Sequence, residues 1–283
     1  MCRFCLYLGP PLRVSSLVTE PGHSLIHQSY RSQEREEPLN GDGFGLAWYA
    51  PEIGPEPAVF RSTTPAWNNR NLLDLARVVC SPCVLAHVRA ATRYAAVTEN
   101  NCHPFRYGRF AFMHNGDVGG FGSVRRPLLD SLSDESFGAI QGNTDSEHVF
   151  ALLLDHVRGR SGAESADALA GAMRATIERV VELVRRYGGG APSYLNMALT
   201  DGRRAVVTRF TSDLPEHSET LYLNRGRGYV CEGGVCRMIP ADEGSSAVLV
   251  SSEPLSQESG WEVIPANHMV VIREDRSARV LPC

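Results

Sequence analysis

The sequence lacks any apolar run approaching the roughly 20 residues of a membrane-spanning helix, and no stretch is basic enough to favour nucleic acid as a main partner. A secretory signal peptide is also missing, because Gly9-Pro10-Pro11 ends the short apolar run after Arg3. No internal repeat and no change of composition divides the 283 residues. These absences predict a cytoplasmic protein without a membrane or nucleic-acid partner, and we expect residues 2–283 to form a single domain.

The order of the predicted elements favours an α+β fold over an alternating α/β fold. Hydrophobic residues make up 43% of the chain and charged residues 21%, which is ordinary for a globular protein. Helices are expected at Asp145–Arg158 and Ala166–Tyr187, with strands before and after them. The other predicted segments are helices near Ser24–Tyr30 and at Asn69–Val79, and strands at Arg3–Leu8, Phe44–Tyr49, Ala58–Arg61, Cys83–Arg89, Arg109–Met113, Tyr194–Thr200, Ala205–Phe210, Leu221–Leu223, Ala247–Ser251 and Met269–Arg273. This order predicts two antiparallel sheets with helices packed outside them.

Eight cysteines are present, and in a cytoplasmic protein we expect them to be thiols rather than disulfides. Three pairs have spacings that also occur in zinc sites: Cys2/Cys5, Cys80/Cys83 and Cys231/Cys236. The first pair should not share an ion, because residues three apart on a strand point to opposite faces. We interpret the second pair as core residues, and a turn would place the third pair across a hairpin. We predict no metal site, and the sequence assigns no role to the second and third pairs.

Cys2 directly follows the initiator methionine. Cysteine is small, so Met1 is expected to be removed, which would leave Cys2 with both a thiol and a free α-amine. An α-amine titrates near a pKa of about 7.7–8.0, so part of it is neutral at pH 7 and can serve as the base that a thiol nucleophile needs. Taken alone, a cysteine at this position is better explained as a buried strand residue. The other motifs of the chain reverse that preference.

Four short segments place polar side chains beside glycines or at strand and helix ends: His87–Thr92, Asn101–Phe105, Met113–Gly116 and Asn143–Glu147. An arginine at a strand end, Arg89, is suited to hold a carboxylate through two parallel hydrogen bonds. The Asn115 amide and the Gly116 N–H can form an oxyanion hole. Asp145, in the first turn of a predicted helix, can face the amine of a ligand.

Each segment also has a purely structural interpretation. Arg89 could form a surface ion pair, Asn115 begins the commonest hairpin dipeptide, and Thr144 with Glu147 forms a helix capping box. Together with Cys2, however, the segments supply a nucleophile with its base, two oxyanion donors, and a cation and an anion for the carboxylate and ammonium of an amino acid. Those are the parts that cleavage of an amide requires.

The combined motifs resemble the class II glutamine amidotransferases, which are N-terminal-nucleophile hydrolases. The resemblance is greatest to the stand-alone group that contains the ergothioneine-pathway γ-glutamyl amidohydrolase and the yeast glutathione-degradation amidotransferase subunit. It implies a four-layer αββα sandwich and no cofactor. The matching segments are Met1–Phe4, Gly41–Tyr49, His87–Thr92, Asn101–Phe105, His114–Gly116, Asn143–Glu147 and Ser251–Leu255 with Trp261 and Pro265–Val271.

The resemblance implies a role for each candidate site residue. The roles are nucleophile and base for Cys2, oxyanion hole for Asn115 and Gly116, carboxylate ligand for Arg89, ammonium ligand for Asp145, and supporting pocket residues for Thr92 and His103. Ala90 and Arg93 stand where bifunctional members often have other residues, which leaves the rim of the pocket unassigned.

The implied function is hydrolysis of a γ-glutamyl amide, in a conjugate or in glutamine, through a thioester on Cys2 with release of glutamate. About thirty residues follow Ser251–Leu255, too few for a second domain that consumes ammonia. Two alternatives are a glutaminase that delivers ammonia to a partner chain or works in a complex with it, and a non-catalytic scaffold subunit. A metal- or redox-responsive cysteine protein is a further possibility. A small γ-glutamyl compound is the expected ligand, with a partner subunit in the alternatives.

Overall fold

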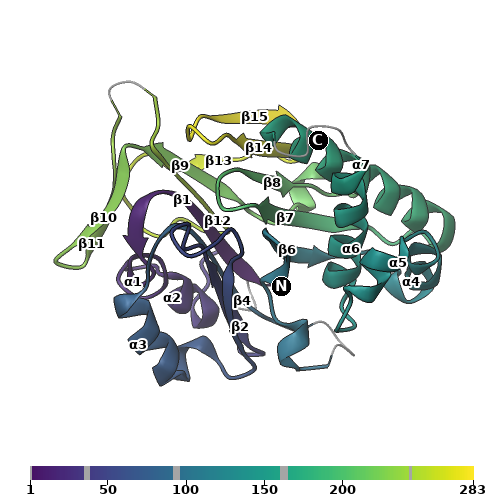
Figure 1. Cartoon of the computed structure of the whole chain (residues 1–283), viewed down its shortest axis with the longest axis horizontal. Helices are drawn as coiled ribbons and strands as arrows, with labels where there is room; N and C mark the ends of the chain where they lie inside the picture. The colour runs from purple at the N-terminus through teal and green to yellow at the C-terminus, as the bar shows by residue number, and fades with distance from the viewer. Residues whose placement is uncertain (1, 35–38, 92–95, 160–164, 242–243) are drawn as a thin grey trace.

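The computed structural model describes residues 2–34, 39–91, 96–159, 165–241 and 244–283, which form two sheets with helices on their outer sides (Figure 1). Every strand pairing in these sheets is antiparallel. The larger sheet has the order β13 (Glu262–Val263), β9 (Tyr222–Gly226), β12 (Ala247–Ser251), β1 (Arg3–Arg13), β4 (Cys80–Val88), β2 (Phe44–Trp48) and β3 (Ala58–Ser62). The smaller has the order β15 (Ala278–Pro282), β14 (His268–Ile272), β8 (Ala205–Arg209), β7 (Tyr194–Thr200), β6 (Phe110–Asp117) and β5 (Phe105–Tyr107).

Helices cover the outer face of each sheet. The larger sheet is covered by α1 (Ser15–Val18), α2 (Leu25–Tyr30) and α3 (Arg70–Val78), together with the ribbon of β10 (Gly228–Glu232) and β11 (Val235–Ile239). The smaller sheet is covered by α4 (Phe121–Leu129), α5 (Asp134–Gly138), α6 (Asp145–Arg158) and α7 (Ala166–Tyr187). Short 3₁₀ turns lie at Ala66–Asn68, Glu99–Asn101 and Pro215–His217. None of the described helices is long and apolar enough to cross a membrane.

Three apolar clusters define the layers. One lies between the sheets, one beneath α6 and α7, and one beneath α1 to α3. Along β1, Phe4, Leu6 and Leu8 belong to the cluster between the sheets, whereas Cys5 and Tyr7 belong to the cluster under the helices. This alternation is the period of two expected of a strand with both faces buried. The α+β prediction and the αββα layer order are confirmed.

Several element boundaries differ from the sequence prediction. Gly9-Pro10-Pro11 does not end β1, which continues to Arg13 because a register shift between Leu8 and Leu12 accommodates the two prolines. The hairpin-turn interpretation of Asn115-Gly116 is wrong as well, since both residues lie within β6 and pair with Asn196 and Leu195 of β7. Elements not predicted are α1, α4, α5, β5, β13 and β15. Four predicted elements have the predicted bounds, and the other predicted helices and strands are present with ends shifted by a few residues. The four are Asp145–Arg158, Ala166–Tyr187, Tyr194–Thr200 and Ala247–Ser251.

Candidate active site

Cys2 lies at one end of the sandwich, immediately before β1. The alternation along β1 places its side chain on the inner face with Phe4 and Leu6, and places Cys5 on the opposite face as predicted. The pairing of Arg3 with Val88 sets Cys2 opposite Arg89, which follows β4. The thiol Sγ lies 3.6 Å from the carbonyl oxygen of Ala90, within hydrogen-bond reach for sulfur.

Asn115 and Arg89 face the same space between the sheets. On β6, Ala111 and Met113 belong to the inner cluster, and Asn115 continues that series by a period of two. On β4, Cys83 and Leu85 are inner residues in the same way, and Arg89 lies four residues beyond Leu85. In the larger sheet, β1 and β4 thus direct the Cys2 thiol and the Arg89 guanidinium to one end of the sandwich. In the smaller sheet, β6 directs the Asn115 amide to the same end.

These two polar side chains are buried and have atoms without partners. Arg89 is 3% exposed, donates one hydrogen bond from Nη2 to the carbonyl oxygen of Ala96 at 3.3 Å, and has no partner for Nη1 among the described residues. Asn115 is fully buried, and neither atom of its amide is paired with a described residue. Buried polar atoms are nearly always hydrogen-bonded in proteins, so unpaired ones require an explanation. A ligand that carries a carboxylate and a polarised carbonyl would pair both.

Gly116 has a backbone that only glycine tolerates. Its φ is +150°, and a Cβ at this position would collide with the carbonyl oxygen of Tyr194 on β7. The conformation therefore keeps the backbone beside Asn115 free of a side chain. Its role as an oxyanion donor stays a prediction.

Asp145 begins α6, where Thr144 caps the helix by accepting a hydrogen bond from Glu147 N at 3.3 Å. The Glu147 carboxylate does not complete the capping box, because it accepts hydrogen bonds from the N–H groups of Gln141 and Gly142 instead. The Asp145 carboxylate accepts hydrogen bonds from Val118 N and Ser146 N, each at 2.8 Å. The helix start is thereby tied to the end of β6, which brings Asp145 near the Asn115-Gly116 segment. Each carboxylate oxygen retains capacity for a ligand amine.

His103 is buried beside the site, with both ring nitrogens unpaired among the described residues. Its ring lies 4.2 Å from the ring of His87, centroid to centroid. The segment that carries it packs closely on β2: a Cβ at Gly43 would lie 2.7 Å from the Cys102 sulfur, and one at Gly45 would collide with the His103 carbonyl oxygen. The glycines of the Gly41–Tyr49 motif therefore allow this segment to enter the space between the sheets. Thr92 lies outside the described residues.

Burial dominates the electrostatics of the site. It raises the pKa of the Cys2 thiol, while the hydrogen bond to Ala90 and the charges of Arg89 and Arg3 oppose that rise. Burial also lowers the pKa of His87 to about 3 and holds the pKa of His103 well below its usual range. The resting site therefore contains a neutral thiol and neutral imidazoles near pH 7.

Two further features were not predicted from the sequence. Asp117 follows Asn115 by two residues on the same strand, and alternation places its carboxylate on the same side; burial and the charge of Asp145 raise its pKa. The alternation along β6 was the signal that would have found it. The second feature is the buried ion pair between Arg3 and Glu253, which connects the residue after Cys2 to the Ser251–Leu255 motif. The sequence does not predict this pair, because its two residues lie far apart along the chain.

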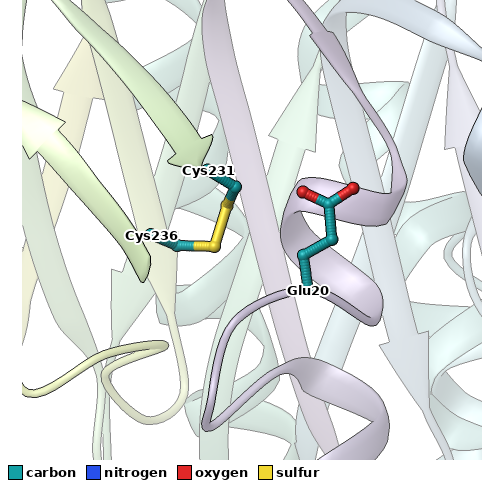
Figure 2. A group of neighbouring side chains, drawn as sticks. All are labelled: Glu20, Cys231 and Cys236. Carbon is teal, nitrogen blue, oxygen red and sulfur yellow. A yellow bond between two sulfur atoms is a disulfide. The ribbon is translucent and has the colours of Figure 1, made fainter. Parts of the chain in front are cut away.

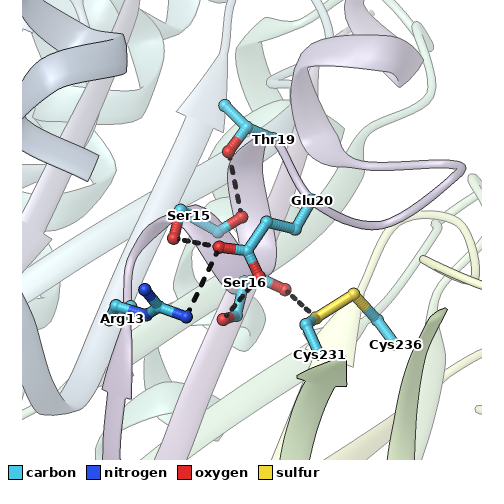
Figure 3. Close-up of a disulfide and its surroundings, with 7 residues drawn as sticks. All are labelled: Arg13, Ser15, Ser16, Thr19, Glu20, Cys231 and Cys236. Atoms are coloured by element: carbon cyan, nitrogen blue, oxygen red, sulfur yellow. Dashed lines mark hydrogen bonds and ion pairs between the residues drawn. A yellow bond between two sulfur atoms is a disulfide. The ribbon is translucent and has the colours of Figure 1, made fainter. Parts of the chain in front are cut away.

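Among the described residues, one group of potential metal ligands lies away from this site. It consists of Glu20, which follows α1, and of Cys231 and Cys236 on the β10–β11 ribbon (Figure 2). The two cysteines are directly opposite on β10 and β11 and form a disulfide (Figure 3). The hairpin prediction is confirmed, but the expectation that these cysteines are thiols is wrong, because the register brings their Cα atoms to 4.0 Å. Disulfide sulfurs are not the thiolates that bind zinc, and the Glu20 carboxylate accepts hydrogen bonds from Ser15 and Ser16.

Comparison with known proteins finds relatives that match most of this chain. The family described as "Glutamine amidotransferases class-II" matches residues 16–225. The chain is 39% identical to a probable glutamine amidotransferase, DUG3, of Saccharomyces cerevisiae, over 97% of this chain and 82% of that protein. It is 28% identical to the gamma-glutamyl-hercynylcysteine sulfoxide hydrolase of Mycolicibacterium smegmatis, over 97% of this chain and 96% of that one.

Solved structures of glutamine amidotransferases have the same fold as this chain. A glutamine aminotransferase class-II domain protein from Silicibacter pomeroyi superposes with a TM-score of 0.69 at 26% identity, covering 99% of both chains. The phosphoribosylpyrophosphate amidotransferase of Bacillus subtilis has the same fold at a TM-score of 0.61 and 14% identity, and the match covers 49% of that chain.

Proposed function

The chain belongs to the class II glutamine amidotransferases, and from this premise we propose that it hydrolyses the amide bond of a γ-glutamyl compound through a thioester on Cys2. Residues 2–283 would act as one domain. The proposal takes Cys2, Asn115 and Gly116 as the catalytic residues, and Arg89 and Asp145 as the residues that bind the glutamyl group. Thr92 and His103 would support the pocket.

One observation carries the proposal: two side chains at the same end of the sandwich as Cys2, Arg89 and Asn115, have buried polar atoms without partners among the described residues. A glutamyl group would pair them, because its α-carboxylate fits Arg89 Nη1 and its δ-carbonyl oxygen fits the Asn115 amide. Its α-ammonium would approach the carboxylate of Asp145. The proposed site would thus match a γ-glutamyl compound at three of its groups, which are the α-carboxylate, the δ-carbonyl oxygen and the α-ammonium.

The mechanism follows from the groups at hand. After removal of Met1, the free α-amine of Cys2 would accept the proton of the thiol as sulfur attacks the δ-carbonyl carbon. Asn115 and the Gly116 N–H would stabilise the negative charge that develops on oxygen, a contribution of about 10²–10³ in rate for one such donor. The amine then gives its proton to the departing nitrogen, and water cleaves the thioester to release glutamate. No metal is required in these steps.

The nature of the departing amine distinguishes two versions of the proposal. The relative from M. smegmatis is named as a hydrolase of a γ-glutamyl compound, which favours direct hydrolysis of a conjugate. The yeast relative is named as a glutamine amidotransferase, which favours release of ammonia from glutamine for use by a partner chain. We favour direct hydrolysis of a conjugate.

The test is release of glutamate from glutamine and from a panel of γ-glutamyl amides. Intact mass spectrometry of the same sample would establish whether Met1 is absent, and acid-quenched samples would be searched for a glutamyl adduct on Cys2. Cys2→Ala is the inactive control, and Cys5→Ala is the matched control because Cys5 faces the opposite side of β1. An active enzyme that retains Met1, or turnover that survives Cys2→Ala, would refute the proposal.

A further inference from the structure

A fully buried ion pair lies directly behind the nucleophile. Arg3 faces the helix side of the larger sheet, opposite to Cys2, and its side chain is 0% exposed. Its Nε donates a hydrogen bond to Glu253 Oε1 at 2.7 Å. Its Nη1 donates a hydrogen bond to the carbonyl oxygen of Cys2 at 3.0 Å. A fully buried, charged side chain thus holds the peptide group of the residue that carries the thiol.

Glu253 has hydrogen-bond partners in addition to Arg3. Its carboxylate also accepts hydrogen bonds from the Ser32 hydroxyl and from Gln33 N, and it hydrogen bonds with His23 Nε2 at 2.7 Å. These donors lower the pKa of Glu253 to about 2 although burial alone would raise it. The carboxylate is therefore ionised and fixed, so it fixes the guanidinium in turn.

The neighbouring residues of both partners are joined as well. Phe4 N donates to the Ser252 hydroxyl and Ser252 N donates to the Phe4 carbonyl oxygen, each at 3.0 Å. The Ser251–Leu255 motif, which the catalytic proposal leaves without a role, is thereby bound to the first residues of β1. Burial of an ion pair is costly and adds little stability compared with apolar residues of the same size. Because this costly ion pair lies next to the proposed nucleophile, we interpret it as functional rather than as a source of stability.

We propose that Arg3 and Glu253 are positioning residues, which fix the backbone of Cys2 so that its thiol and α-amine are aligned for attack on the substrate carbonyl. The inference rests on the proposed function of Cys2. A guanidinium is needed because its planar donors reach Glu253 and the Cys2 carbonyl oxygen at the same time, whereas a lysine ammonium is a point charge. The substrate's carboxylate and ammonium are bound elsewhere, so the effect belongs to the chemical step.

The test compares Arg3→Lys, Glu253→Gln and the double variant Arg3→Met/Glu253→Met with wild type. The double variant removes both charges of the pair, so that neither is left buried without the other, and its Tm shows whether it folds. We expect kcat to fall about 10- to 100-fold in each variant, since small misplacement of reacting groups has effects of that size, with KM within about threefold of wild type. Arg225→Lys and Glu262→Gln are the matched controls, because this exposed ion pair joins β9 to β13 of the same sheet, and they should leave kcat unchanged.

Two outcomes would overturn the inference. One is a folded double variant with wild-type kcat, and the other is a loss that appears in KM alone. Reaction of Cys2 with iodoacetamide gives a readout that does not depend on the substrate. The double variant should react at least about threefold more slowly at pH 8, because its thiol is no longer aligned with the α-amine that would accept the proton. If wild type releases no glutamate from any substrate, the proposed function fails, and unchanged alkylation of Cys2 would then refute the positioning role separately.

Discussion

Replacement of Arg89 by methionine should lower kcat/KM for the substrate without lowering the stability of the protein. The guanidinium is 3% exposed and its Nη1 has no partner among the described residues. A bound α-carboxylate would receive two charge-assisted hydrogen bonds, each of about 1.5–3 kcal/mol, so their loss amounts to about 3–6 kcal/mol. That energy corresponds to a decrease in kcat/KM of roughly 10²- to 10⁴-fold. In contrast, Arg89 has no ion-pair partner in the described part of the chain, and removal of such a buried charge should leave Tm unchanged or raise it.

A truncated substrate makes the assay specific. Glutamate analogues are made by joining the same leaving group to glutamate or to 4-aminobutanoate, which lacks the α-carboxylate. Arg89→Met should lose activity on the first compound and keep the wild-type rate, within about threefold, on the second, because the deleted contact is absent there already. Equal losses on both compounds, or a decrease in Tm of many degrees, would show that Arg89 supports the fold rather than the substrate.

Three further predictions concern other parts of the structure. Asn115→Ala should lower kcat by about 10²- to 10³-fold with little change in KM, measured by glutamate release. Because the pKa of His87 is about 3 in the folded protein and about 6.5 when unfolded, the unfolded chain alone binds a proton between these values. The free energy of unfolding should therefore fall as pH drops below about 6.5, by about 1.4 kcal/mol per unit, and His87→Gln should flatten that slope in urea titrations. Reduction of the Cys231–Cys236 disulfide, or Cys236→Ser, should lower the free energy of unfolding by at most about 2 kcal/mol because the closed loop is short, and should leave kcat unchanged.

The sequence predicted the long, regular elements well. The helix Ala166–Tyr187 and the strand Ala247–Ser251 have the predicted bounds, because apolar spacing over many residues and flanking turn residues specify them locally. The short elements were missed for the opposite reason. α4 contains Pro127, and β5 has three residues, so each depends on packing against its neighbours rather than on its own pattern.

Contacts between residues that are far apart in sequence could not be predicted from the sequence. Asn115-Gly116 is a frequent hairpin dipeptide, and only the pairing of β6 with β7 shows that it continues a strand instead. The partnership of Arg3 with Glu253 spans almost the whole chain and has no local signature. The disulfide was excluded on the expected compartment, whereas the register of the ribbon brings the two cysteines together irrespective of compartment.

The state of the thiol determines which group can act as its base. Burial raises the pKa of Cys2, so in the proposed mechanism the sulfur would enter the reaction protonated and would lose its proton during attack. The buried imidazoles of His87 and His103 are poor acceptors, because their lowered pKa values make their protonated forms unstable. A free α-amine with a pKa near 7.7–8.0 is better matched to the task. A chain that retains Met1 would keep every contact of the Cys2 side chain and still lack this base, which is why the mass of the active species decides the mechanism.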